Sequence, residues 1–258
     1  MSDTPVICFG QQPCGIFPKR FLVAKILTAW RLQKEIGGRI VFFFHDSDHD
    51  YRETATLLTH KKTGQKFSFN FTFPNKTHKK YTPLYRKHFK EDWKAGTRRQ
   101  LPNYVDKELV EIFDSVETTN ISDFCLEVYE KMGWLDEVEV VRSSDSELRS
   151  NAIDIEEHFA DLEWQGELVR AQRMNGKYCL HRGGNAYHEL PDVCCEKSQI
   201  SPTRDSRLLW MQSIIGCTHY IAGEGELAYL DQSQTPEIEF VKRDAIENSS
   251  EAWTTINS

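Results

Sequence analysis

VICFGQQ at residues 6–12 and RIVFFFHDSDHD at residues 39–50 each open as a short apolar run and close on polar side chains. The apolar part of each run shows no polar alternation, which is typical of strands in a parallel sheet covered on both faces. Residues 20–36 carry an apolar stripe and stop at Gly37-Gly38, so they predict a crossover helix. The sequence therefore predicts an α/β fold with a Rossmann-like parallel sheet flanked by helices.

Antiparallel hairpins and further helices are expected in the rest of the chain. Residues 54–59 and 67–73 flank a polar turn, and the second run alternates Phe with polar residues, which predicts an antiparallel hairpin appended to the sheet. A second hairpin is expected to join 168–173 to 178–182 through Asn175-Gly176, a pair that suits a type I′ turn. Further helices are expected at 105–116, 123–132, 144–162 and 207–215, and a last helix opens at Leu227. Ser122 is the expected N-cap of the second of these, and Ser144 and Glu147 have the spacing of a capping box for the third. Strands are expected at 138–141 and 218–222.

The chain length bounds the number of domains. With 258 residues the chain fits a single Rossmann-like domain over residues 1–258, with an insertion at about 54–135. The tail after Gln232 is polar and is expected to be loosely held.

The net charge of −7 conceals a basic segment. Residues 76–99 contain nine Lys or Arg against Glu91 and Asp92, so this segment carries +7 and the remainder −14. Basic residues interleaved with aromatic ones can mark nucleic-acid contact. We expect instead a solvated insertion whose aromatic side chains pack inward, because the acidic remainder would repel a phosphate backbone. On a narrower interpretation, a few of these cations attract a small anionic substrate.

Membrane insertion and secretion are not expected. No apolar stretch approaches the roughly 18 residues of a membrane helix, and the N-terminus has no basic region followed by an apolar signal core. The seven cysteines are an odd number without a CxxC pair, so reduced thiols are expected. We therefore predict a cytoplasmic protein that binds small molecules and neither nucleic acid nor membrane.

Glycine and polar residues follow three of the expected strands at the point where each strand ends. In an open α/β sheet, ligands bind beyond the carboxyl ends of the strands. We therefore expect one crevice lined by three segments, Gly10-Gln11-Gln12, His45-Asp46-Ser47-Asp48-His49-Asp50 and Gly223-Glu224-Gly225-Glu226.

The middle segment holds two histidines and three aspartates within six residues. Acid–base chemistry or substrate hydrogen bonding by Asp48, His49 and Asp50 is the favoured interpretation. A divalent metal held by His45, Asp48 and His49 is an alternative, although alternate residues at a strand end point apart. A solvated loop in which an aspartate caps the next helix is the third interpretation.

The order and spacing of these motifs carry a resemblance to a known family. The residues are Gly10-Gln11-Gln12 with Lys25, Asp48-His49-Asp50-Tyr51 with Glu53, and Ser201-Pro202 with Arg207, Gly223, Glu226, Leu227, Ala228 and Tyr229. The pattern resembles the cysteine-adding enzymes of bacillithiol biosynthesis. It implies a Rossmann-like core that joins L-cysteine to glucosaminyl malate through a C–N amide bond. The chain departs from the family pattern at residues 17–20, Ser47, Met211-Gln212 and Glu224.

The resemblance also implies roles for individual residues. Asp48, His49 and Asp50 would be catalytic, orienting the amine and managing its proton. Lys25 and Arg207 would hold the anionic part of the substrate, with a salt bridge from Lys25 to Asp48 or Glu53 as the alternative. The expected substrate-binding set is Gly10, Gln11, Gln12, Lys25, Glu53, Arg207, Gly223, Gly225, Glu226 and Tyr229.

Amide formation needs an activated carboxylate, so ATP is an expected cosubstrate, although neither a phosphate-loop motif nor paired HxGH histidines occur. No metal is expected. The alternatives are a metal-dependent hydrolase and a non-catalytic metabolite-binding protein.

Assembly is the last expectation from the sequence. Family members dimerise through a helical coiled-coil arm, whereas no heptad run follows Tyr229 and Pro236 interrupts any helix there. We therefore expect a monomer, or a dimer that does not use a coiled coil.

Overall fold

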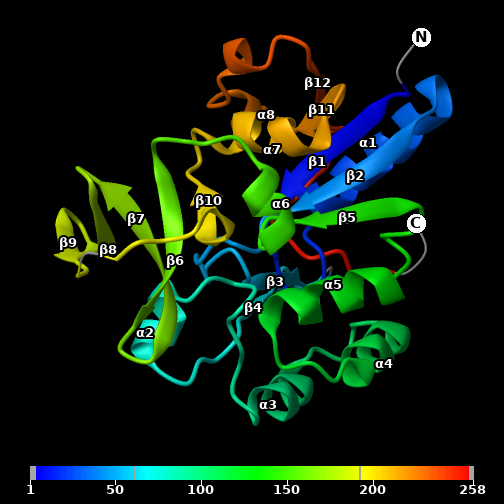
Figure 1. Ribbon diagram of the computed structural model, residues 1–258. Coiled ribbons are helices and arrows are strands. Elements are labelled where there is room, and N and C mark those ends of the chain that lie inside the picture. The colour runs from blue at the N-terminus through cyan, green and yellow to red at the C-terminus, as the bar shows by residue number, and fades with distance from the viewer. Residues whose placement is uncertain (1–3, 61, 192, 256–258) are drawn as a thin grey trace.

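A five-stranded parallel sheet forms the centre of the computed structural model, which describes residues 4–60, 62–191 and 193–255 (Figure 1). The strands lie in the order β12-β11-β1-β2-β5, and all four neighbouring pairs are parallel. The bounds are β1 Val6–Gln11, β2 Arg39–Phe44, β5 Val138–Arg142, β11 His219–Ala222 and β12 Glu239–Lys242. The predicted α/β class with a Rossmann-like parallel sheet is confirmed.

Helices cover both faces of this sheet (Figure 1), which explains why its strands lack polar alternation. On one face Phe9 and Phe42 share a core cluster with residues of α1 (Arg20–Ile36) and α5 (Ile121–Lys131). On the other face Cys8 and Phe43 pack with residues of α6 (Ser146–Asn151) and α7 (Arg207–Ile215). The bounds of α1 and α7 are those predicted. No helix in the described part of the chain is long and apolar enough to cross a membrane.

The long connection between β2 and β5 packs below the sheet as a mostly helical layer. Its elements are β3 (Thr56–Thr59), β4 (Lys66–Phe69), α2 (Lys76–Tyr81), α3 (Trp93–Gln100), α4 (Lys107–Ser115) and α5. Phe89 and Trp93 are each 4% exposed and pack against Phe124, so these aromatic side chains of the basic segment point inward as expected.

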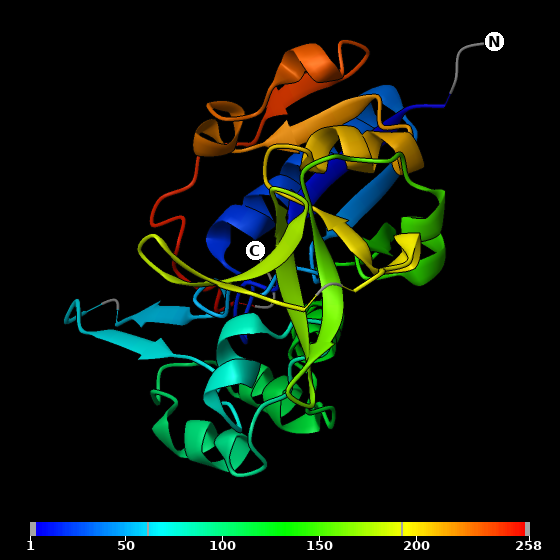
Figure 2. The same ribbon diagram turned by 60° about the vertical axis from the view of Figure 1, so that its left-hand side comes forward.

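The first hairpin forms at the predicted residues, but it does not join the parallel sheet. β3 and β4 pair antiparallel in a two-stranded sheet of their own, and Figure 2 shows this hairpin as a separate arm. The prediction that it extends the parallel sheet is wrong. The strand also ends at Phe69, because Phe71 stacks on Phe89 in the core instead of continuing the pairing.

A second, antiparallel sheet has the order β10-β6-β7-β8-β9. Its strands are β6 His158–Trp164, β7 Glu167–Met174, β8 Lys177–Gly183, β9 Ala186–Glu189 and β10 Ile200–Pro202, with a 3-10 turn η1 at Lys197–Gln199. The predicted turn is confirmed, because Asn175 and Gly176 have φ angles of 49° and 81°. The helix predicted over residues 144–162 is confirmed only as α6, which ends at Asn151; its predicted continuation is wrong, because residues 158–164 form β6 and pair with β7.

Three helix starts differ from the sequence prediction. Asn120, and not Ser122, caps α5 by accepting a hydrogen bond from the Asp123 amide. Asp145 caps α6, while the Ser144 hydroxyl donates to Asp46 at 2.8 Å. The last helix, α8, is a single turn over Glu224–Leu227 and therefore ends where it was expected to open.

The C-terminal segment is held by the rest of the fold, so the expectation of a loose tail is wrong for its described residues. After a 3-10 turn η2 at Gln232–Gln234, β12 pairs with β11 along its four residues. Further on, Ala252 donates to the Leu57 carbonyl at 2.8 Å, and the first turn of α1 donates to the carbonyls of Ser249 and Glu251. The segment thus closes over the start of α1, and Ala252 is only 4% exposed.

This closure predicts a difference between two neighbouring substitutions. Ala252→Glu places a carboxylate in the interior without a partner and is expected to lower the free energy of unfolding by about 3 kcal/mol or more. Ser250→Glu, at an exposed position two residues away, should change it by less than about 0.5 kcal/mol. Urea unfolding measures both variants, and equal effects would mean that the segment is not packed as described.

Candidate functional site

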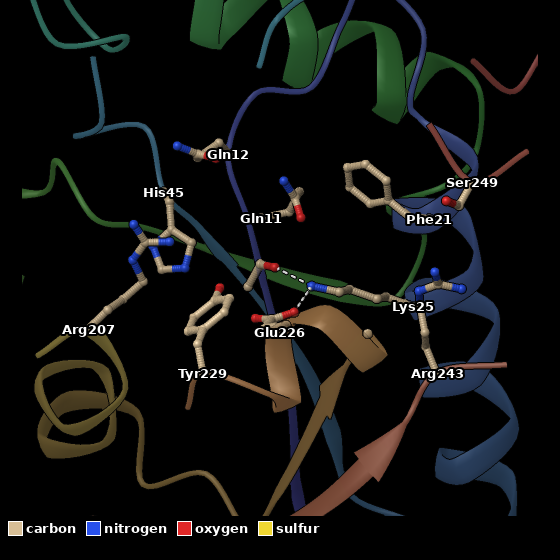
Figure 3. Close-up of a pocket in the computed structure, with 12 residues that line it drawn as sticks. Gln11, Gln12, Phe21, Lys25, His45, Arg207, Glu226, Tyr229, Arg243 and Ser249 are labelled. Carbon is tan, nitrogen blue, oxygen red and sulfur yellow. Dashed lines mark hydrogen bonds and ion pairs between the residues drawn. The ribbon is translucent and has the colours of Figure 1, made fainter. Parts of the chain in front are cut away.

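The carboxyl ends of β1, β2 and β11 bring the three predicted segments to one edge of the parallel sheet (Figure 3). Two adjoining pockets open there. The first, which we call the Lys25 pocket, has a volume of about 260 Å³, and its lining includes Gly10, Lys25, Gly223 and Glu226. The second, which we call the Asp48 pocket, has a volume of about 510 Å³ and is lined by residues that include Asp48, His49, Asp50 and Glu53.

Gln12 and Arg207 line both pockets, so they form the junction between them. The expected single crevice is therefore two chambers that share a wall. Gln11 and Tyr229 line the Lys25 pocket, whereas Gly225 lines neither chamber. Apart from Gly225, every predicted site residue reaches one chamber or the other.

Lys25 extends from α1 under the end of β1, and its side chain is 4% exposed. Its ammonium donates to the Gly10 carbonyl at 2.8 Å and to Glu226 Oε2 at 2.7 Å (Figure 3). The predicted alternative of a salt bridge to Asp48 or Glu53 is wrong. An ammonium carries three donors, and these two bonds leave one N–H for a ligand.

Glu226 reaches the same spot from α8 and uses both carboxylate oxygens. Oε2 accepts from Lys25, and Oε1 accepts a 2.8 Å hydrogen bond from the Tyr220 hydroxyl. Burial and the neighbouring Glu226 charge raise the pKa of Tyr220, so its hydroxyl stays protonated as a donor. Lys25, Glu226 and Tyr220 therefore fix the floor of the pocket from α1, α8 and β11, of which α1 is distant in sequence from the other two.

Gly10 is packed so closely that a side chain would collide with the floor of the pocket. A Cβ at this position would lie 2.6 Å from His45 Nε2 and 2.8 Å from the Tyr220 hydroxyl. His45 is itself 4% exposed. Burial, together with the charges of Arg207 and Lys25, lowers the pKa of His45 well below its usual value, so the imidazole is neutral at physiological pH.

Asp48 lines the larger chamber beside Gln12 and Arg207, the two residues of the junction. Its carboxylate accepts a hydrogen bond from Gln12 and a 2.6 Å bond from the backbone amide of His49. The Asp48 oxygens lie 3.6 Å from Arg170 Nη1 and 3.7 Å from Arg207 Nη2. Burial alone would raise the pKa of Asp48, but Arg170 and the other nearby positive charges outweigh it and lower that pKa, so the group is an anion at physiological pH.

His49 follows Asp48 and lines the larger chamber. Burial lowers the pKa of His49 to about 4, with Asp48 acting in the opposite direction and Arg170 in the same one. The neutral ring places Nδ1 3.4 Å from Arg170 Nη1 and packs against Phe159. A neutral imidazole beside a fixed carboxylate can accept a proton or a hydrogen bond from a substrate.

The outer part of the Asp48 pocket carries mixed charge. Asp50 forms an ion pair with Arg52 at 2.6 Å, and Glu53 lies 3.8 Å from Lys19. The remaining cationic side chains of the rim are Lys80, Arg182 and Arg204. This chamber therefore offers the Asp48 carboxylate beside Gln12 and Arg207, and charges of both signs further out.

Four residues of the site escaped sequence analysis: Lys87, Arg170, Tyr220 and Arg243. Arg170 lies in β7 and is 4% exposed, where its guanidinium donates to the Ser201 hydroxyl and the Pro202 carbonyl. Lys87 is fully buried and donates to the His49 carbonyl. Both occur in segments whose composition resembles a solvated surface, so no local pattern distinguishes them.

No protein-family model matches the chain, and no curated protein matches its sequence. Within residues 4–60, 62–191 and 193–255, no group of three or more His, Cys, Asp or Glu side chains is placed to hold a metal ion.

The close packing around Gly10 predicts contrasting effects of two glycine substitutions. Gly10→Ala drives a methyl group into His45 and Tyr220 and should cost about 1–3 kcal/mol of stability. Gly225→Ala, in the short helix α8 with no atom within 4 Å of the added Cβ, should stay within about 0.5 kcal/mol of wild type. Thermal or urea unfolding measures the free energy of unfolding of both variants, and equal stability of the two would contradict the packing described for Gly10.

Lys87 provides a prediction about pH. Burial lowers the pKa of the Lys87 ammonium to about 7 from 10.5, although Asp48 and Asp50 raise it. Between these values the unfolded chain holds a proton that the folded chain lacks, so this group adds stability as pH rises from 7 to 10.5. The stability advantage of wild type over Lys87→Met should therefore grow between pH 7 and pH 10.

Lys90→Met removes one charge from an exposed lysine in the same segment and serves as the control. Its stability difference from wild type should stay nearly constant over the same pH range. A pH-independent difference for Lys87→Met would show that the buried ammonium keeps its ordinary pKa.

Proposed function

We propose that the protein is a ligase-type enzyme that forms a C–N amide bond between an amino acid, with L-cysteine as the first candidate, and an amine-bearing small molecule, as in bacillithiol synthesis. The observation that carries the proposal is the pair of unequal chambers that meet at Gln12 and Arg207. A condensing enzyme must hold two reactants with their reacting atoms in contact, and two chambers with a common wall meet that need.

The Lys25 pocket suits the smaller, acyl-bearing reactant. Its volume of about 260 Å³ fits a group of amino-acid size, and Arg207 and Arg243 supply positive charge for a carboxylate or an acyl phosphate. The Glu226 carboxylate in the floor of the pocket already accepts from Lys25 and Tyr220, and its remaining lone pairs can accept from an ammonium or hydroxyl group. L-Cysteine carries all of these groups.

The Asp48 pocket suits the larger, amine-bearing reactant. Its volume is about 510 Å³, and the Asp48 carboxylate beside the junction attracts an ammonium group. The cations Lys80, Arg182 and Arg204 at the mouth favour a molecule whose far end is anionic. An amino sugar joined to a dicarboxylic acid, such as glucosaminyl malate, has this distribution of charge.

The reaction needs a free amine and an activated carbonyl. The amine enters as the free base, its ammonium proton having passed to water. The neutral His49 ring, whose pKa is about 4, accepts a hydrogen bond from an amine N–H and so orients the nitrogen, and Asp48 holds that nitrogen beside the junction. The second proton that the nitrogen loses leaves with the departing phosphate or adenylate group. The amine nitrogen then bonds to the carbonyl carbon while the bond from that carbon to its phosphate or adenylate leaving group breaks. Gln12 and Arg207 donate hydrogen bonds to the oxygen that gains negative charge.

ATP is the proposed source of the activated acyl group. Gly10 does not form an open phosphate cradle, because its carbonyl accepts from Lys25 and its Cα lies against His45 and Tyr220. The cationic side chains Arg207 and Arg243, rather than a glycine-rich loop, would hold the phosphate oxygens. Supply of ATP makes the activation favourable, and the residues of this chain orient the two reactants.

The test is a condensation assay read by mass spectrometry. Purified protein with L-cysteine, glucosaminyl malate and ATP should yield a product whose mass is the sum of the two reactants less one water. Arg207→Met should lower kcat/KM by at least about tenfold, because the junction loses a charged donor. Arg98→Met, an exposed arginine paired with Asp114, should leave kcat/KM unchanged.

Repeating the assay with other amino acids and other amines distinguishes an error in the proposed substrates from an error in the proposed reaction. Amide formation from any pair supports the ligase proposal. Stabilisation of the protein by these metabolites without product would instead identify a metabolite-binding protein and contradict the proposal.

A further inference from the structure

Three side chains of the second sheet form a hydrogen-bonded row outside both chambers of the candidate site. The Cys195 thiol, in the segment between β9 and η1, lies 2.8 Å from the Tyr178 hydroxyl of β8. That hydroxyl lies 3.1 Å from Nε2 of His158, the first residue of β6. None of the three residues lines the Lys25 pocket or the Asp48 pocket, so the row is separate from the proposed ligase site.

The direction of each hydrogen bond follows from the inner end of this row. Nδ1 of His158 lies 2.9 Å from the Ile155 carbonyl, which can only accept, so Nδ1 carries a proton. In the neutral ring Nε2 therefore accepts from the Tyr178 hydroxyl. The hydroxyl has a single proton, so its oxygen accepts from the Cys195 thiol. The thiol proton thus points along a path that ends at the basic nitrogen of an imidazole.

The same atomic positions fit a second distribution of protons. When the thiol passes its proton to Tyr178 and Tyr178 passes its own to Nε2, the row holds a thiolate, a neutral tyrosine and an imidazolium. Both bonds of the row are kept with their directions reversed, and the Ile155 carbonyl still accepts from Nδ1. A nucleophile, a base and a third group that orients the base are the parts of an activated-cysteine site.

Tyr178 is suited to carry a proton without ionising. Burial and the hydrogen bond to Cys195 raise the pKa of Tyr178, with the positive charge of Arg173 acting in the opposite direction. The hydroxyl therefore stays neutral in both proton distributions. It connects the thiol to a base that the sulfur does not touch directly.

The charged groups around the row favour onward transfer of the proton from His158. His158 shares a pocket lining with four charged side chains, Arg149, Asp154, Arg173 and Lys197. Arg149 is paired with Asp161 and Lys197 with Asp154, whereas Arg173 forms no ion pair in the part of the chain that the structure describes. A neighbouring cation disfavours a lasting positive charge on His158, so the imidazole acts as a temporary proton acceptor.

Cys195 is held in place and is still open to a reagent. Its side chain is partly buried against the apolar cluster of the second sheet, to which Tyr178 also packs. His158 at the inner end of the row is 2% exposed. The adjacent Cys194 is more exposed than Cys195 and provides an internal comparison.

We propose that Cys195 is a thiol–disulfide exchange site for small disulfides, with Tyr178 as the proton relay and His158 as the general base. The Cys195 sulfur attacks one sulfur of the small disulfide, and a new S–S bond forms as the old one breaks. The thiol proton passes through Tyr178 to His158 and returns along the row to the departing sulfur, which leaves as a thiol. The small disulfide is reduced and Cys195 becomes a mixed disulfide. The inference is independent of the proposed ligase activity, because it concerns different residues.

Bis(2-hydroxyethyl) disulfide, a small neutral disulfide, is the probe on the full chain, and peptide mass spectrometry locates and times the adduct at pH 7. Cys194→Ser leaves Cys195 as the thiol of this pair, and Cys195→Ser leaves Cys194. An ordinary thiol has a pKa of about 8.5 and is mostly protonated at pH 7, so Cys195 should react at least about tenfold faster than Cys194 despite its lower exposure. Equal rates, or faster reaction at Cys194, would overturn the proposal.

A tyrosine substitution in the Cys194→Ser background tests the relay. Tyr178→Phe removes the connecting hydroxyl and should slow the reaction of Cys195 about fivefold or more at pH 7. At pH 10 the thiolate forms without a base, so the variant and its parent should react at the same rate. Tyr187→Phe, at an exposed tyrosine of β9, is the matched control and should react as its parent does at both pH values.

Two results with Tyr178→Phe would contradict the relay. An unchanged rate at pH 7 would show that the hydroxyl has no part in activation, and a deficit that persists at pH 10 would show a displaced sulfur instead of a lost base. The comparison of the two serine variants keeps Tyr178 in place, so it tests the proposal even where Tyr178→Phe does not fold.

Discussion

The interaction on which the structure depends most is the pairing of the Asp48 carboxylate with the guanidinium of Arg170. Asp48 lies four residues past the end of β2 in the parallel sheet, and Arg170 lies in β7 of the second sheet. Burial lowers the pKa of Arg170 to about 10, so it is still a cation at physiological pH and needs a nearby anion. Removing one partner of a buried ion pair typically costs about 3–5 kcal/mol of stability. Because the two partners lie in different sheets, this ion pair connects the sheets, and it also fixes the Asp48 carboxylate in the candidate site.

The central βαβ unit could be predicted from sequence because its signals are local. The unbroken apolar runs of β1 and β2, the helical stripe of α1 and the glycine stop at Gly37 each depend on a few neighbouring residues. The gathering of Gly10, the Asp48 segment and Gly223 also followed from a general rule, since parallel strands bring their carboxyl ends to one edge. The sequence therefore predicts that these segments gather at one edge of the sheet, and the structure shows that they do.

Contacts between distant segments could not be predicted in this way. The local sequence predicts that the α6 helix continues through residues 158–164, whereas pairing with β7 makes these residues the extended strand β6. Likewise the polar strand β12 is stabilised by β11, and Glu226 meets Lys25 across 201 positions of sequence. Arg170 is the clearest example of a contact that local sequence does not predict, since nothing about an arginine in a predicted hairpin indicates that it is buried beside Asp48.

The central claim is that two chambers with a common wall hold two different reactants. The most direct measurement is a crystal structure of the protein grown with L-cysteine and glucosaminyl malate and without ATP, so that no condensation occurs. We expect cysteine in the Lys25 pocket, the amine of the second molecule beside Asp48, and Gln12 and Arg207 between the two ligands. Both molecules in one chamber, or neither chamber occupied while the ligands bind elsewhere, would contradict it.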